Sequence, residues 1–157
     1  MRGVTGHTIA VVSNVAARAG LGDAIDQFGD VVAIAGDDPL TGFRAARDRY
    51  LAATDRPGSL QRVVRSRLGE MTLDRYLGIM CCDTLVHTWD VAMGLGLRTD
   101  FEPSHLAFVR SQYALRTGAT MRGPDLYGDE LAPDSDDDLT AILAFTGRGP
   151  ARSVSAV

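Results

Sequence analysis

The stretch CCDTLVHTWDVAMGLG, residues 81–96, places an acid and a histidine four residues apart in an otherwise apolar segment. On an α-helix, residues four apart lie about 40° from one another around the axis, and residues seven apart lie within about 20°. A helix here would therefore align Asp83, His87 and Asp90 in one stripe. The apolar pattern continues back to residue 73 and ends at glycines, so the sequence predicts a long helix over residues 73–94.

Two carboxylates and an imidazole in line on an apolar helix need an explanation, because burying an unpaired charge is costly. Three explanations remain open: a strip that faces solvent, a core network with satisfied hydrogen bonds, or a metal site. Helical bundles build metal sites from carboxylates and imidazoles at such intervals. A metal needs a third ligand, and the two other histidines are His7 and His105. For His7 the ordinary alternative is a core or surface role, and for His105 a role at a helix start.

The rest of the chain shows helical spacing and little of the alternation that a sheet-based core needs. Capping residues and glycines bound each predicted helix. Besides residues 73–94, helices are predicted over residues 6–19, 39–54 and 103–116, and a last helix near residue 136. The predicted capping residues are Asp37 or Asp38 for the helix 39–54, Thr72 for the helix 73–94, and Ser135 or Asp136 for the last helix. The glycine-rich, proline-rich and acidic segment before the last helix predicts a loop. The predicted fold class is all-α.

Composition indicates one domain over residues 1–150 and a disordered tail over residues 151–157. The chain has 157 residues, of which 45% are hydrophobic, and a formal charge of −4, so it has no basic excess for nucleic acid. Its apolar runs are shorter than the roughly 20 residues that cross a membrane, and no secretory signal is visible, which indicates a cytoplasmic protein. The adjacent Cys81 and Cys82 are predicted to be reduced thiols in the core.

Three segments carry a resemblance to a known family. DTLVHTWDVAMGLG, residues 83–96, resembles the signature of the metal-binding domain of mycothiol-dependent maleylpyruvate isomerases, within the DinB-like superfamily. VTGHTIAVV, residues 4–12, is similar to the family's first metal-binding helix, and ILAFTGRGP, residues 142–150, to the ending of its small single-domain members. The resemblance implies a DinB-like helical bundle of the four-helix type.

Carried over residue by residue, the resemblance implies that His7, Asp83 and His87 are metal ligands. Asp90 is then a group that supports the ligands or the helix packing, and Trp89 a core residue. Two imidazoles and a carboxylate suit a borderline divalent ion, zinc first, with nickel or iron also open. The implied function is that of a metal-dependent, transferase-like enzyme that uses a low-molecular-weight thiol, mycothiol or a similar compound, with an unknown co-substrate. No catalytic or cofactor-binding residue beyond the ligands is indicated.

The chain departs from the family at both ends. The family has a long helix before its first metal histidine, so the bundle is predicted to lack its first helix. The isomerases carry a further C-terminal domain that this chain does not contain, so isomerase activity is not carried over. The alternative function is a non-catalytic helical module, with a structural metal or none, that acts through self-association as a homodimer.

Overall fold

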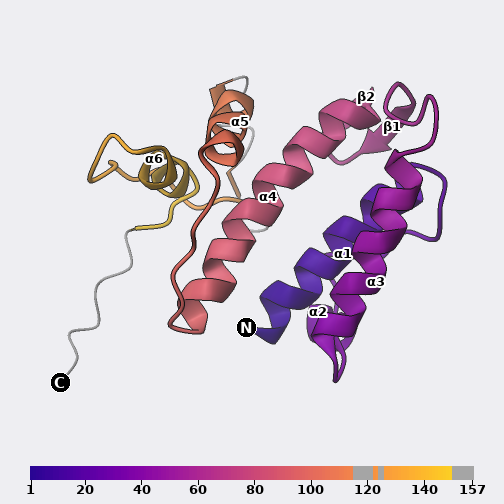
Figure 1. The fold of residues 1–157 in the computed structure, drawn as a ribbon, viewed down its shortest axis with the longest axis horizontal. Helices are drawn as coiled ribbons and strands as arrows, with labels where there is room; N and C mark the ends of the chain where they lie inside the picture. The colour runs from indigo at the N-terminus through magenta and orange to yellow at the C-terminus, as the bar shows by residue number, and fades with distance from the viewer. Residues whose placement is uncertain (115–121, 124–125, 150–157) are drawn as a thin grey trace. The chain divides into compact units, whose positions relative to one another are not determined.

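The structure is a computed structural model that describes residues 1–114, 122–123 and 126–149. These residues are mostly helical, which confirms the predicted helical class, and they include one two-stranded sheet that was not predicted (Figure 1). The elements are α1 (Arg2–Arg18), α2 (Val31–Ala35), α3 (Pro39–Thr54), β1 (Val63–Ser66), β2 (Gly69–Thr72), α4 (Leu73–Gly94), α5 (Pro103–Ala114) and α6 (Asp138–Phe145). The chain divides into two compact units, Met1–Gly94 and Leu95–Val157. The predicted tail lies outside the described residues.

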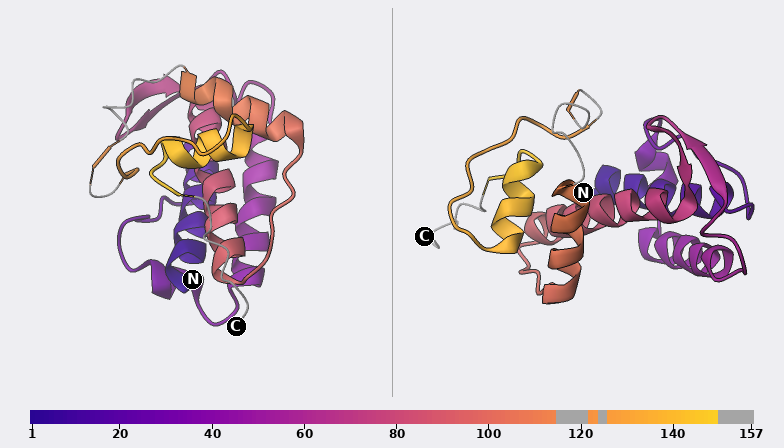
Figure 2. Two further views of the ribbon diagram at one scale, coloured as in Figure 1. Left: turned by 90° about the vertical axis from the view of Figure 1, so that its left-hand side faces the viewer. Right: turned by 90° about the horizontal axis from the view of Figure 1, so that it is seen from above.

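Helix α1 is the centre of the first unit, where it packs against α2, α3 and α4 (Figures 1 and 2). It runs antiparallel to α4: His7, near its start, meets His87 in the second half of α4, whereas the guanidinium of Arg18 stacks 4.7 Å from the ring of Tyr76 in the first turn of α4. One core cluster joins α1, α3 and α4 to the sheet and consists of Val15, Ala16, Ala19, Ala53, Val64, Leu73 and Tyr76.

Local capping signals account for where the predicted helices begin. The side chain of Asp38 accepts a hydrogen bond from the Thr41 amide at the start of α3, and the Thr72 hydroxyl accepts one from the Arg75 amide at the start of α4. Helix α4 has the predicted bounds, and α1 begins four residues before its predicted start. The predicted cap of α6 was wrong, because Asp137 accepts from the Thr140 amide in that role.

The β-hairpin between α3 and α4 pairs Val63 with Thr72 and Ser66 with Gly69. Gly69 has φ +99°, a backbone conformation that favours glycine. Val64 is buried in the core cluster, while its neighbour Val63 is exposed, so the hairpin uses the alternation of a strand with one covered face.

The second unit contains α5 and α6. Arg110 of α5 forms a 2.7 Å ion pair with Asp138 of α6, and the ring of Tyr113 stacks on that of Phe145 with centroids 4.4 Å apart. The last two residues of the predicted helix 103–116, and part of the predicted loop after it, lie outside the described residues. Among the described helices, none is both long and apolar enough to cross a membrane.

Candidate metal centre

The structure brings His7, Asp83 and His87 together. One potential ligand atom from each lies within 4.8 Å of the others, and among the described residues this is the one group of histidine, cysteine and acidic side chains placed closely enough to share an ion. His7 comes from the second turn of α1, and Asp83 and His87 lie one turn apart on α4. The three residues are far apart in the sequence but meet because α1 and α4 pack against each other.

The carboxylate of Asp83 lies between the two imidazoles. Its Oδ2 atom is 3.6 Å from Nε2 of His7, and its Oδ1 atom is 3.6 Å from Nε2 of His87. The two rings are edge to face, with centroids 5.0 Å apart. Both N–O separations are longer than a good hydrogen bond, and the two Nε2 atoms face different oxygens of the same carboxylate.

The outer nitrogen of each imidazole has an acceptor that fixes its orientation. Nδ1 of His7 lies 3.0 Å from the carbonyl oxygen of Gln27, and Nδ1 of His87 lies 2.9 Å from Oδ2 of Asp90. A carbonyl or carboxylate only accepts, so both Nδ1 atoms donate a proton, and in the neutral rings both Nε2 lone pairs point toward Asp83. Two lone pairs and a carboxylate repel one another unless a proton or a cation lies between them.

The polar network around the three groups is incomplete. Oδ2 of Asp83 is buried and has no hydrogen-bond partner. Among the described residues, Nε of Arg18 is the one other buried side-chain atom of which this is true. The side chains of His7, Asp83 and His87 are 17 to 19% exposed, which does not fit a strip that faces solvent. A hydrogen-bond network in which the His7 ring is neutral leaves this carboxylate oxygen without a donor.

The pKa of His7 is raised above its ordinary value. The largest cause is hydrogen bonding toward Asp83, which raises the pKa. Burial of the ring lowers the pKa, and the charge of Asp83 and the hydrogen bond to the Gln27 carbonyl raise it further. At the observed 3.6 Å the contact with Asp83 is better described as a long ion pair than as a short hydrogen bond. The site therefore attracts positive charge, either as a proton on His7 or as a metal ion.

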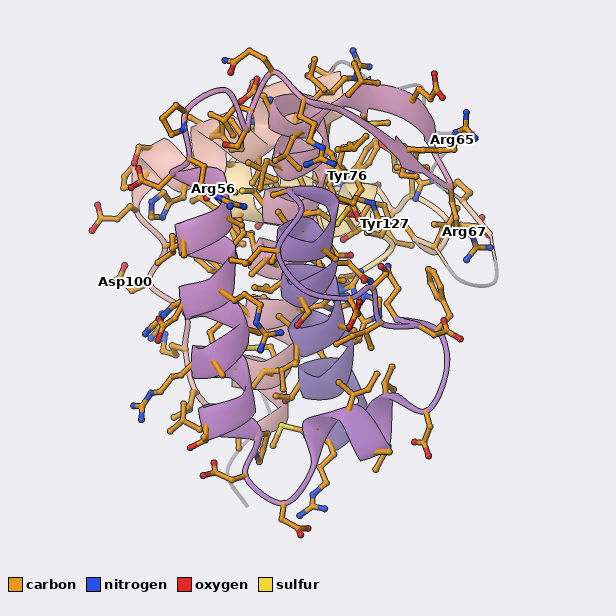
Figure 3. All side chains as sticks on the ribbon, turned by 90° about the vertical axis from the view of Figure 1, so that its right-hand side faces the viewer. Arg56, Arg65, Arg67, Tyr76, Asp100 and Tyr127 are labelled. Carbon is orange, nitrogen blue, oxygen red and sulfur yellow. The ribbon has the colours of Figure 1, made fainter. Side chains whose placement is uncertain are left out.

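An aromatic ring and an arginine lie beside the imidazole of His7. The ring of Phe28, from the segment between α1 and α2, lies 6.1 Å from the His7 ring, and Phe28 is 40% exposed. The guanidinium carbon of Arg67 lies 4.5 Å from the Phe28 ring centroid. Arg67 and its neighbour Arg65 project from the hairpin in Figure 3.

Sequence reasoning missed Gln27 and Phe28. Gln27 meets His7 through its main-chain carbonyl, a group that every residue has, so no side-chain pattern could indicate it. The predicted supporting residue Asp90 is in contact with His87, as its position in the stripe suggested.

The other residues that the sequence singled out are not members of the group formed by His7, Asp83 and His87. His105 is exposed at the start of α5, in the second unit. Both cysteines are free thiols, and Cys82 is buried as predicted, but the prediction for Cys81 was wrong because it is exposed on α4. Trp89, predicted to be a core residue, is only partly buried.

Two relatives of the chain come from Mycobacterium tuberculosis, one from the strain CDC 1551 / Oshkosh and one from ATCC 25618 / H37Rv, and both are described as uncharacterized. Each is 33% identical to the chain over 95 residues, which cover 59% of the chain and 52% of the relative. The chain thus spans about half the length of the curated relatives that it matches. No family model matches it, and no solved structure matches it significantly.

Proposed function

We propose that the chain binds a divalent metal ion through Nε2 of His7, a carboxylate oxygen of Asp83 and Nε2 of His87. The single observation that carries the proposal is the Asp83 carboxylate between two imidazoles whose outer nitrogens are both held by acceptors, with its buried Oδ2 making no hydrogen bond. Metal-binding histidines typically donate their second N–H to a carbonyl or a carboxylate, and here one histidine does each. Zinc is the first choice for this donor set, and nickel and iron also accept it.

We further propose that the first unit is a DinB-like helical bundle related to the metal-binding domain of mycothiol-dependent maleylpyruvate isomerases. Support comes from the family's signature around His87, with His7 and Asp83 at its other ligand positions, and from the packing of α1 against α4. The first helix of the described residues, α1, is the one that carries His7.

The activity proposed for this centre is that of a metal-dependent enzyme using a low-molecular-weight thiol, mycothiol or a similar compound, with a second substrate. A divalent ion held by three protein groups would lower the pKa of a water or thiol at its remaining position. His7 and His87 hold their orientation through Gln27 and Asp90, and the partial exposure of all three ligands leaves the centre accessible to a small molecule. Phe28 and Arg67 would form part of the surface that such a molecule meets.

A specific observation favours a second candidate, a non-catalytic module that self-associates as a homodimer. Leu40 and Leu51 of α3 are 55% and 51% exposed, and burying such apolar surface against a second copy would be favourable. In this candidate the metal stabilises the packing of α1 on α4 and reacts with nothing.

Both candidates, as proposed, include a bound metal ion, and a measurement of metal content tests this assumption. Purified wild type loaded with zinc and then desalted should retain about one ion per chain by elemental analysis, while His87→Ala should retain almost none. His105→Ala is the matched control, because it removes an exposed histidine of α5 and should bind zinc like the wild type. Wild type without retained zinc, nickel or iron would contradict the proposal.

A cobalt-substituted protein separates the two candidates. If a thiol binds the ion, adding low-molecular-weight thiols to the cobalt form should produce a thiolate-to-cobalt absorption band, and a panel of electrophilic co-substrates should then reveal turnover. Metal binding with no thiol band and no turnover, together with a dimer in analytical ultracentrifugation, would support the non-catalytic module.

A further inference from the structure

The segment of residues 21–30, between α1 and α2, is held by one buried side chain of α1. Asn14 is 3% exposed. Its Oδ1 atom accepts a 2.7 Å hydrogen bond from the amide of Ile25, and its Nδ2 atom donates a 2.8 Å hydrogen bond to the carbonyl of the same residue. The side chain thus pairs with both main-chain groups of Ile25, as a neighbouring strand would.

The same side chain also holds Gln27. Nδ2 of Asn14 donates a second hydrogen bond, 3.2 Å long, to Oε1 of Gln27. The main-chain carbonyl of Gln27 in turn accepts the N–H of His7 at 3.0 Å. Asn14 and His7 are seven residues apart on α1 and lie on the same face of the helix, so the segment folds back over that face and connects the two.

We propose that Asn14 is a positioning residue of the metal centre, which acts on His7 through Ile25 and Gln27 and couples the order of residues 21–30 to metal binding. The inference rests on the proposed function, because it concerns the same ion. Asn14 fixes where the Gln27 carbonyl lies, and that carbonyl fixes the ring of His7 with Nε2 toward Asp83.

The coupling works in both directions. If an ordered segment raises the affinity of the centre for its ion, the ion must favour the ordered segment by the same factor. The segment carries Phe28, whose ring lies beside His7, so metal loading would also fix the aromatic side chain next to the ion. Loss of the ion would release that side chain together with the segment.

The test compares Asn14→Ala with Ser13→Ala. Ser13 is also 3% exposed, and as the next residue on the helix it points about 100° away from Asn14, so it controls for the loss of a buried polar group. Zinc affinity is measured by competition with a chromophoric chelator. We expect Asn14→Ala to weaken binding by about 10-fold or more, the usual effect of losing a group that orients a ligand, and Ser13→Ala to change it less than about 2-fold.

Two further readouts distinguish positioning from a general loss of stability. Amide hydrogen exchange of residues 21–30 should slow on adding zinc to the wild type, and this slowing should be lost in Asn14→Ala. At a pH above the pKa of His7, the ¹⁵N shifts of its ring in the metal-free protein should report a proton on Nδ1 alone in the wild type and a mixture of tautomers in the variant. If Asn14→Ala fails to fold by circular dichroism, Gln27→Gly replaces it, because it removes the Oε1 contact in a partly exposed loop.

The outcomes separate this inference from the function on which it rests. Wild type that binds no metal overturns the proposed function and this inference with it. Wild type that binds zinc, with unchanged affinity in Asn14→Ala, overturns the role of Asn14 and leaves the metal centre standing. Unchanged affinity in Gln27→Gly overturns the step from Asn14 through the Gln27 side chain. If zinc binds the wild type but does not change the hydrogen exchange of residues 21–30, the proposed coupling is wrong and the metal centre still stands.

Discussion

Nδ1 of His87 and Oδ2 of Asp90 lie 2.9 Å apart across one turn of α4, on the side of the imidazole that faces away from Asp83 and His7. A carboxylate in this position holds the ring and makes its other nitrogen a stronger donor to a metal. The local spacing of acid, histidine and acid on one helix thus places the proposed ligands Asp83 and His87 beside Asp90, which orients the histidine.

Replacing Asp90 with asparagine should weaken zinc binding by about 10- to 100-fold without abolishing it, because the amide keeps a hydrogen bond but removes the negative charge. The control is Asp74→Asn, an acid in the first turn of the same helix, which should bind zinc like the wild type. Chelator competition measures both affinities. Equal affinities for the two variants would show that Asp90 does not act on the ion.

Metal affinity should fall at acid pH, because protons compete for His7. The pKa of His7 is raised, chiefly by hydrogen bonding toward Asp83, so the competition should begin at a higher pH than for an ordinary histidine. Zinc titrations at a series of pH values measure this effect, and NMR of the metal-free protein measures the pKa directly. A pKa for His7 below the ordinary histidine value would contradict the electrostatic description of the site.

The contribution of His7 to the stability of the metal-free protein should fall as the pH rises, whereas the metal affinity should rise. A group whose pKa is higher in the folded state contributes stability that is complete below its unfolded pKa and is lost as the pH rises through its folded pKa. The free energy of unfolding of the wild type, relative to His7→Gln, should therefore decrease as the pH rises from acid to alkaline. Urea unfolding of both proteins without metal tests the sign, and a difference that grows with pH would refute it.

Gly6→Ala should destabilise the protein although alanine is the better helix former. A Cβ atom at this position would lie 1.7 Å from the main-chain oxygen of Val31, so α2 would have to move away from α1. We expect a loss of about 1 to 3 kcal/mol, which exceeds the gain of up to about 1 kcal/mol from helix propensity. Gly3→Ala is the control, since its Cβ would be 3.6 Å from a Val31 methyl group and should be tolerated. Urea denaturation of the two metal-free variants should show opposite shifts.

Zinc should stabilise the wild type against unfolding, because the three proposed ligands converge only in the folded chain. At a free zinc concentration 100 times the dissociation constant the gain should be about 2.7 kcal/mol. The gain should disappear on adding a chelator and be absent from His7→Gln. A similar gain in His7→Gln would place the zinc elsewhere on the protein.

Local signals in the sequence were enough to predict α4 and its polar stripe. Thr72 caps the helix, the apolar run is continuous, and the positions of Asp83, His87 and Asp90 follow from helix geometry alone. Spacing could not show that His7 lies next to them, because that depends on how α1 docks against α4. It was the resemblance to a known family that singled out His7, and the structure places it there.

The missed elements owe their structure to contacts that are distant in sequence. Helix α2 is only five residues long and rests on α1 where Gly6 leaves room for it. The strands of the hairpin have four residues each, too few for alternation to stand out, although Val63 and Val64 are typical of strands. The Gln27 carbonyl carries no sequence signal at all.

The position of the proposed ligands along the chain has a consequence for the order in which the proposed centre would assemble. Asp83 and His87 lie one turn apart on α4, so that helix alone could capture an ion once its central turns have formed. His7 would reach such an ion only after α1 has docked against α4. An ion held by the local pair would then act as a template that recruits the N-terminal helix during folding, and zinc present from the start should speed the final step of refolding.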